Sequence, residues 1–178
     1  MPCRGPIPCP PPRVPRRLGI IGLVHSTSVN LHVDAPRRAV YRALLDAEAI
    51  ARWRVPAGMH SIVHEFEARE GGRFRVSLTY ELPGPAGKSS THTDTYHGRF
   101  TRLVPDSQVV EVIEFESEDP AFAGSMTMTT TLTDSGDGTD VVILHEGIPD
   151  GVAPADNEAG TRMALANLAK LVEDSSRP

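Results

Sequence analysis

Two histidines stand on strand-like segments whose neighbours on the same face are apolar. His64 lies between Ile62 and Phe66 at alternate positions, and His145 follows Ile143 in the same way. Alternation of this kind places every second side chain on one face of a strand. Because an imidazole can donate or accept a hydrogen bond, both side chains could anchor a ligand inside an apolar pocket. The alternative is a neutral core histidine that bonds to a neighbouring protein group.

Patterns typical of catalytic or metal sites are weak. His60 and His64 are four residues apart, which on a strand separates them by about 13 Å, too far to share one metal ion. We interpret Asp156 and Glu158 as charges that favour a helix N-terminus rather than as an acid–base pair. The sequence has no phosphate-binding glycine motif and no nucleophile–base spacing. We therefore predict no metal, no cofactor and no catalytic residue, and an enzyme is the least favoured function.

The C-terminal segment from Asp156 to Asp174 has the spacing of a helix with one buried face. Its second half carries large apolar residues on that face, but Gly160 and Thr161 stand in its first half. A glycine inside a helix costs about 0.5–1 kcal/mol relative to alanine. We infer that the helix leaves a pocket there. Since a cavity costs about 24 cal/mol per Å³, either a ligand fills this space or neighbouring side chains close it.

Strand and helix patterns precede this segment. The alternation at 26–33 predicts a strand, and two short helices follow, of which the second covers Ala47–Trp53. Further strands are expected near 61–68, 73–80, 92–104, 107–117, 125–133 and 141–147. The order β-α-α-β-β-β-β-β-β-α predicts an α+β fold, in which the long C-terminal helix covers one face of an antiparallel sheet.

Composition limits the class of protein. The net charge is −5 although residues 1–26 contain four arginines and no acid, so the body is acidic and a nucleic-acid surface is not expected. The apolar run Leu18–Val24 is too short to span a membrane. Both cysteines lie in the first ten residues, which leaves the body without a disulfide and fits a reducing cytoplasm.

The chain divides into an arm and one domain. Seven of the sixteen prolines fall in residues 1–26, a composition that forms neither helix nor sheet. We expect residues 1–25 to be a disordered arm, or to reflect a start site assigned too far upstream. Residues 26–175 are expected to form a single domain.

The body resembles a known superfamily. The segments "APRRAVYRALLDAEAIARW", "FEAREGGRFRV" and "YHGRFTRLVP", with 138–173, resemble the START-like SRPBCC superfamily in order and spacing. Within it, the chain is most similar to the branch homologous to activators of the heat-shock protein 90 ATPase. The resemblance covers about 27–174 and implies a helix-grip fold, in which a curved sheet wraps the C-terminal helix around a cavity. Many relatives have tryptophan where this chain has Thr161, and Arg-Trp-Trp where it has Arg52-Trp53-Arg54.

Together the residues and the resemblance predict a protein that binds a small apolar or amphipathic molecule. Trp53 is a ligand-facing wall or a packing anchor, and Met126 is an adaptable lining or core filler. The residues that we expect at the ligand are Trp53, Met59, His64, Phe66, Tyr80, Tyr96, Gly98, Met126, His145, Gly160, Thr161 and Leu165.

The resemblance keeps two alternatives open. One is a co-chaperone-like activator of the heat-shock protein 90 ATPase, with the chaperone as partner. The less favoured one is a cyclase- or hydrolase-like enzyme that uses the same cavity. Homodimerisation stays open.

Overall fold

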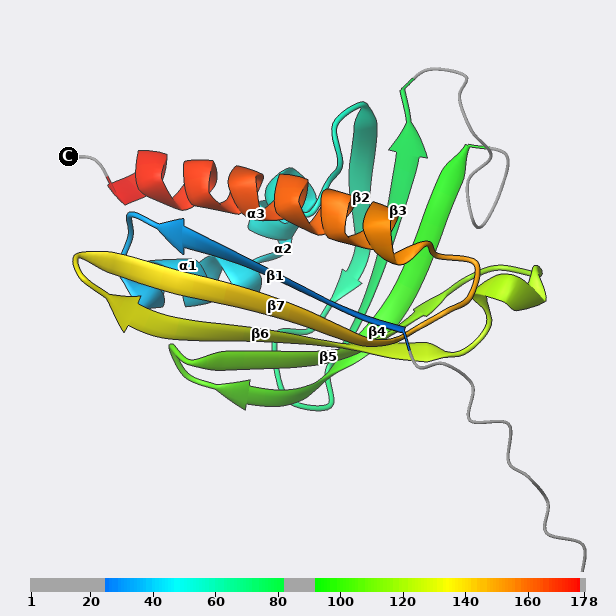
Figure 1. Ribbon diagram of the computed structural model, residues 1–178, viewed down its shortest axis with the longest axis horizontal. Coiled ribbons are helices and arrows are strands. Elements are labelled where there is room, and N and C mark those ends of the chain that lie inside the picture. Colours follow the sequence, from blue (N-terminus) through cyan, green and yellow to red (C-terminus); the bar gives the residue numbers. More distant parts are fainter. Residues whose placement is uncertain (1–24, 82–91, 177–178) are drawn as a thin grey trace, which may run out of the picture.

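The computed structural model describes residues 25–81 and 92–176 (Figure 1). The predicted N-terminal arm lies outside these residues except for His25, which begins the first strand. The elements are β1 (His25–Val33), α1 (Arg37–Leu44), α2 (Ala47–Trp53), β2 (Met59–Phe66), β3 (Arg73–Tyr80), β4 (Thr93–Val104), β5 (Gln108–Phe115), a short 3₁₀ helix η1 (Pro120–Phe122), β6 (Ser125–Ser135), β7 (Gly138–Ile148) and α3 (Pro154–Ser176). Apart from η1, their order is the predicted one.

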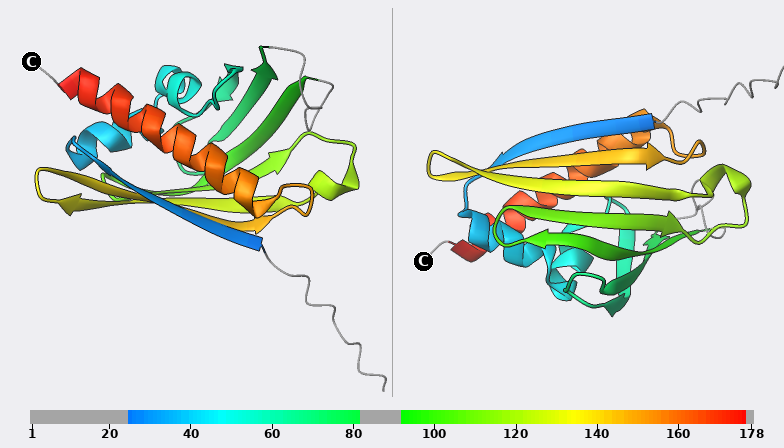
Figure 2. Two further views of the ribbon diagram at one scale, coloured as in Figure 1. Left: turned by 45° about the horizontal axis from the view of Figure 1, so that its top comes forward. Right: turned by 90° about the horizontal axis from the view of Figure 1, so that it is seen from below.

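The seven strands form one antiparallel sheet in the order β1-β7-β6-β5-β4-β3-β2. Consecutive strands from β2 to β7 are neighbours, while β1 returns to pair with β7, so that α1 and α2 connect the two edges. The sheet curves, and α3 runs along its inner face (Figures 1 and 2). This is the predicted α+β helix-grip architecture. Within the described part of the chain, no helix is long and apolar enough to cross a membrane.

The C-terminal half of α3 closes the core. Leu165 and Leu168 are fully buried and Val172 is 4% exposed, so the large side chains of the helix face the sheet. The two short helices pack at the same end, where Trp53 is 1% exposed and its indole nitrogen donates to the Ala43 carbonyl oxygen at 3.1 Å. Full burial of a leucine or valine side chain such as those of α3 stabilises the fold by about 1.5–3 kcal/mol.

Strand β2 departs from simple alternation. Val63 pairs with Val76, but the next paired residue is Glu65, opposite Arg75, so His64 is the extra residue of a β-bulge. A bulge of one residue moves every following side chain to the other face of the sheet.

The bulge overturns the expectation that Ile62, His64 and Phe66 share one face. Ile62 is 55% exposed, whereas Phe66 packs inward, with its ring 5.5 Å from that of Phe100. His64 is exposed and lies on the outer face, where its Nε2 is 2.8 Å from the Ser77 hydroxyl.

Candidate functional site

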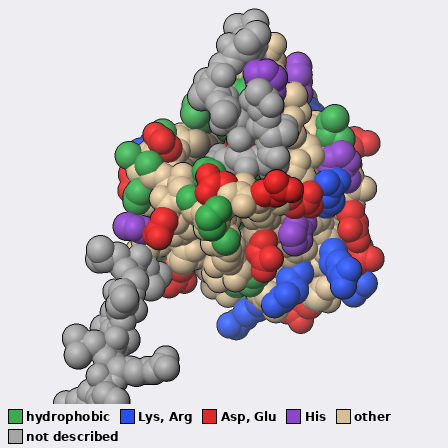
Figure 3. All heavy atoms as spheres, turned by 90° about the vertical axis from the view of Figure 1, so that its right-hand side faces the viewer, with side chains coloured by type: hydrophobic (Ala, Val, Ile, Leu, Met, Phe, Trp, Pro, Cys, Tyr) green, Lys and Arg blue, Asp and Glu red, His purple; other side chains and the backbone are tan. Residues whose placement is uncertain are grey.

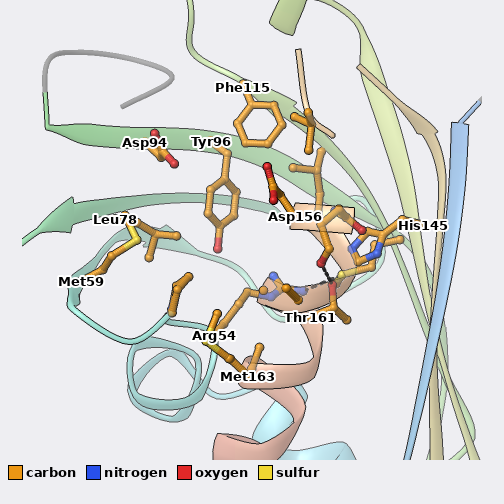
Figure 4. Close-up of a pocket in the computed structure, with 18 of the residues that line it drawn as sticks. Arg54, Met59, Leu78, Asp94, Tyr96, Phe115, His145, Asp156, Thr161 and Met163 are labelled. Carbon is orange, nitrogen blue, oxygen red and sulfur yellow. Dashed lines mark hydrogen bonds between the residues drawn. The ribbon is translucent and has the colours of Figure 1, made fainter. Parts of the chain in front are cut away.

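A pocket of about 570 Å³ lies between the N-terminal half of α3 and the sheet (Figure 4). The helix contributes only small side chains over one stretch of its wall, from Ala159 through Gly160 and Thr161. One and two turns further along, Leu165 and Leu168 are buried in the core, and neither of them lines the pocket. The change in side-chain size along α3 therefore sets the position of the pocket.

Gly160 and Thr161 both leave the pocket unfilled, but for different reasons. A Cβ atom added at Gly160 would meet no heavy atom within 4 Å. Thr161 is 8% exposed, and its hydroxyl donates to the Asn157 carbonyl oxygen within the helix at 2.7 Å. Neither residue reaches across to the sheet as a large side chain would.

An ion pair lies at one end of the pocket, where Arg54 but not Glu111 is among the lining residues. Arg54 directly follows α2, and Glu111 lies on the inner face of β5. The guanidinium donates twice to the carboxylate, with Nη1–Oε1 3.0 Å and Nη2–Oε2 2.6 Å, and the two side chains are 12% and 4% exposed. Although burial works to lower it, the Glu111 carboxylate raises the pKa of Arg54 above its ordinary value. Arg54 is therefore charged, and Glu111 balances its charge.

Tyr96 brings a phenol to the same end. It comes from β4, is 6% exposed, and its hydroxyl points into the pocket (Figure 4). This hydroxyl is buried and has no hydrogen-bond partner among the described residues. Burial raises the pKa of Tyr96, while the nearby Arg54 charge works to lower it. The phenol is therefore a neutral donor at neutral pH, close to the guanidinium without a well-formed hydrogen bond to it.

His145 adds a second buried polar atom without a partner. It comes from β7 and is 5% exposed, and its Nδ1 has no hydrogen bond to the described residues. Burial, assisted by the charge of Arg54, lowers the pKa of His145 to about 4. The imidazole is therefore neutral at physiological pH and offers one donor and one acceptor nitrogen.

The rest of the lining is mainly apolar. Its apolar residues include Met59, Leu78, Phe115 and Met163 (Figure 4). Two acids also line the pocket: Asp94 on β4, which is 4% exposed, and Asp156 in the first turn of α3, which is exposed. Across residues 25–81 and 92–176, no group of three His, Cys, Asp or Glu side chains could hold a metal ion.

The structure brings most of the predicted residues together. The predicted residues that line the pocket are Trp53, Met59, Tyr80, Tyr96, Met126, His145, Gly160 and Thr161. Trp53 lines it and also anchors α2 through its bond to the Ala43 carbonyl oxygen, as its interpretation as a packing anchor predicts.

Four predicted residues lie elsewhere. His64 lies on the outer face with Ile62, and the bulge in β2 turns Phe66 inward, where it packs against Phe100 in the core. Gly98 lies against the Phe74 ring, where an added Cβ would collide with it, and Leu165 fills the core beyond the end of the pocket.

Sequence reasoning missed the ion pair. Glu111 alternates with Val109 and Ile113, both buried, so an acid on an apolar strand face was the available signal. A buried carboxylate needs a cationic or hydrogen-bonding partner. Nothing local identified Arg54 as that partner, because the two residues are 57 positions apart.

The curved sheet, the enclosed helix and the pocket between them define a START-like SRPBCC domain. The model of the family described as "Activator of Hsp90 ATPase homolog 1-like protein" matches residues 34–173, and the chain belongs to this family, as the sequence pattern predicted. No curated protein matched the chain.

Solved structures agree with this assignment. A crystal structure of a Chromobacterium violaceum protein is 32% identical, with a TM-score of 0.74 over 83% of this chain and 96% of that one. An AHSA1-like protein from Aeromonas hydrophila is 21% identical, with a TM-score of 0.64 over 85% and 94% of the two chains. An Arthrobacter aurescens protein is 17% identical, with a TM-score of 0.71 over 85% and 88%. The last two show similarity of fold alone.

Proposed function

We propose that the protein binds a small, mostly apolar or amphipathic molecule in the pocket between α3 and the sheet. The observation that carries the proposal is two buried polar atoms inside an otherwise mainly apolar lining, the Tyr96 hydroxyl and His145 Nδ1, neither of which forms a well-aligned hydrogen bond to the described part of the chain. A buried polar atom that lacks a hydrogen bond costs about 1–3 kcal/mol. A bound molecule that bonds to both atoms would recover this free energy.

The size of the pocket supports the proposal. Small-molecule sites are commonly about 300–1,000 Å³, lined by apolar side chains with a few placed polar groups. The volume of about 570 Å³ falls inside this range. The lining also includes Met126, Met128 and Met163, whose flexible side chains adapt to ligands of different shape.

Ligand binding can be tested with the purified protein. Native mass spectrometry should show a co-purifying small molecule or, after its removal, saturable binding of the neutral dye Nile red at one site. Thr161→Trp should abolish dye binding, because the indole would occupy the pocket wall. Ala166→Trp is the matched control, since Ala166 is an exposed residue of the same helix. Absence of both a co-purified molecule and saturable dye binding would contradict the proposal.

The family description supports a second candidate, stimulation of the Hsp90 ATPase. Measuring ATP turnover by Hsp90 with and without the protein tests it, and an unchanged rate would exclude it. The Thr161→Trp variant separates the two functions: stimulation that persists after the pocket is filled would belong to the outer surface rather than to the pocket.

A further inference from the structure

The pocket offers no unbalanced positive charge to a ligand. Among the described residues that line it, Arg54 is the only lysine or arginine, and both of its terminal nitrogens donate to the Glu111 carboxylate. Asp156, which is exposed, adds an acidic side chain to the lining. Acidic side chains also lie near the middle of the surface at this end of the molecule, with basic ones gathered below them (Figure 3). A carboxylate or phosphate would therefore lose hydration without gaining a cation.

The end of the pocket beside Arg54 is also unsuited to a buried ammonium group. Both carboxylate oxygens of Glu111 are already bonded by Arg54, so an ammonium at this end would face the guanidinium charge. An ammonium group could donate to the Tyr96 oxygen but could not accept a hydrogen bond from its hydroxyl.

An uncharged oxygen atom of a ligand could form hydrogen bonds with the two buried polar side chains of the pocket. It can accept a hydrogen bond from the Tyr96 hydroxyl, and a hydroxyl group can in addition bond to the neutral imidazole of His145. Tyr96, His145 and Arg54 all line the pocket, and the charge of Arg54 acts on both other side chains.

We propose that the ligand is an uncharged molecule with an apolar body and a hydroxyl or carbonyl oxygen, held by the Tyr96 hydroxyl and the His145 ring. This inference rests on the proposed binding function and narrows its ligand class. The apolar body lies toward Met59, Leu78 and Phe115, and the oxygen lies toward the ion pair.

Three matched probes test the charge preference on the full-length protein. Naphthylethanol, naphthylacetate and naphthylethylamine share one apolar body and are neutral, anionic and cationic at neutral pH. In isothermal titration calorimetry, we expect the alcohol to bind about tenfold more tightly than the acid or the amine, because it alone carries no unbalanced charge into the pocket.

A tyrosine substitution tests the contact. Tyr96→Phe should weaken binding of the alcohol about tenfold and leave the two charged probes within about twofold of their original affinities. Tyr41→Phe is the control for loss of a phenol hydroxyl, because Tyr41 lies on α1 and is not among the residues that line the pocket. Amide NMR spectra of each variant verify that the fold is kept.

The outcomes separate this inference from the proposed function. Equal or tighter binding of the acid or the amine would overturn the uncharged ligand class and leave the binding function standing. A Tyr96→Phe variant that binds the alcohol as tightly as the unmodified protein, or that loses all three probes equally, would overturn the hydroxyl contact. Failure of all three probes to bind would overturn the inference, and failure of Nile red as well would overturn the function.

Discussion

Arg54 and Glu111 are joined by two parallel hydrogen bonds of 3.0 and 2.6 Å, although 57 positions separate them in the sequence. The chain contains a second pair joined by two hydrogen bonds: Arg75 donates to Glu116 through Nε at 2.7 Å and through Nη2 at 2.8 Å. The two pairs differ in burial, since the side chains are 12% and 4% exposed in the first pair and 41% and 33% exposed in the second. The exposed pair Arg75–Glu116 therefore serves as a control for the effect of burial on the pair Arg54–Glu111.

Glu111→Gln should lower the free energy of unfolding by about 3–5 kcal/mol, because it leaves the charged Arg54 buried without a balancing carboxylate. Glu116→Gln should cost less than about 1 kcal/mol, because solvent screens the outer pair. Urea unfolding followed by circular dichroism measures both. The double variant Arg54→Met/Glu111→Leu should cost less than Glu111→Gln, since it leaves no buried charge. Equal costs for the two glutamine variants would contradict the prediction.

The stability of the fold should depend on pH through His145. Its pKa is about 4 in the fold and about 6.5 in an unfolded chain, so between these values the unfolded state binds a proton that the fold excludes. The free energy of unfolding is therefore highest above pH 6.5 and falls as pH is lowered toward 4, with a total contribution on the order of 3 kcal/mol. Urea midpoints measured across this range report the slope.

Two variants isolate the histidine from the other groups that titrate at low pH. His145→Gln should flatten the pH dependence between 6.5 and 4, because its side chain stays neutral throughout. His60→Gln, a change at an exposed position of β2, should leave the dependence as it is in the unmodified protein. A slope that survives in His145→Gln would assign the effect to carboxylates instead.

Local signals predicted the elements well. The second helix has the predicted bounds Ala47–Trp53, because Asp46 accepts from the Ala49 backbone nitrogen at 2.7 Å and caps it within the segment itself. The bulge at His64 had no such signal. Alternation continues through it in the sequence, and only the pairing of β2 with β3 shows where the register shifts.

The difference between local signals and tertiary pairing also explains which site residues could be predicted. Gly160 and Thr161 were identifiable because their small size breaks the apolar stripe of one helix, a feature of consecutive residues. Arg54 was not identifiable, because its role depends on the position of β5 relative to the end of α2. Helical periodicity alone could not distinguish Leu165 from Thr161, because both lie on the same face of α3. Thr161 lines the pocket, whereas Leu165, one turn later, is buried in the core.

Gly160→Ala should raise the free energy of unfolding by about 0.5–1 kcal/mol, because the helix gains propensity and the added methyl meets no atom within 4 Å. Gly98→Ala is the matched contrast. Its methyl would collide with the Val112 carbonyl oxygen and the Phe74 ring, so it should cost about 1–3 kcal/mol. Thermal unfolding compares the two variants, and a destabilised Gly160→Ala would show that the space beside α3 is needed for the fold.

Thr161→Trp tests whether the pocket is free space. The side chain of Thr161 is 8% exposed and lines the pocket, so an indole at this position would extend into it. Each square ångström of apolar surface that the indole buries adds about 25 cal/mol, which should at least offset loss of the hydroxyl bond to Asn157. We therefore expect an unchanged or higher melting temperature together with loss of Nile red binding. A melting temperature that falls would mean that protein atoms already need this space, and ligand binding at this position would then be excluded.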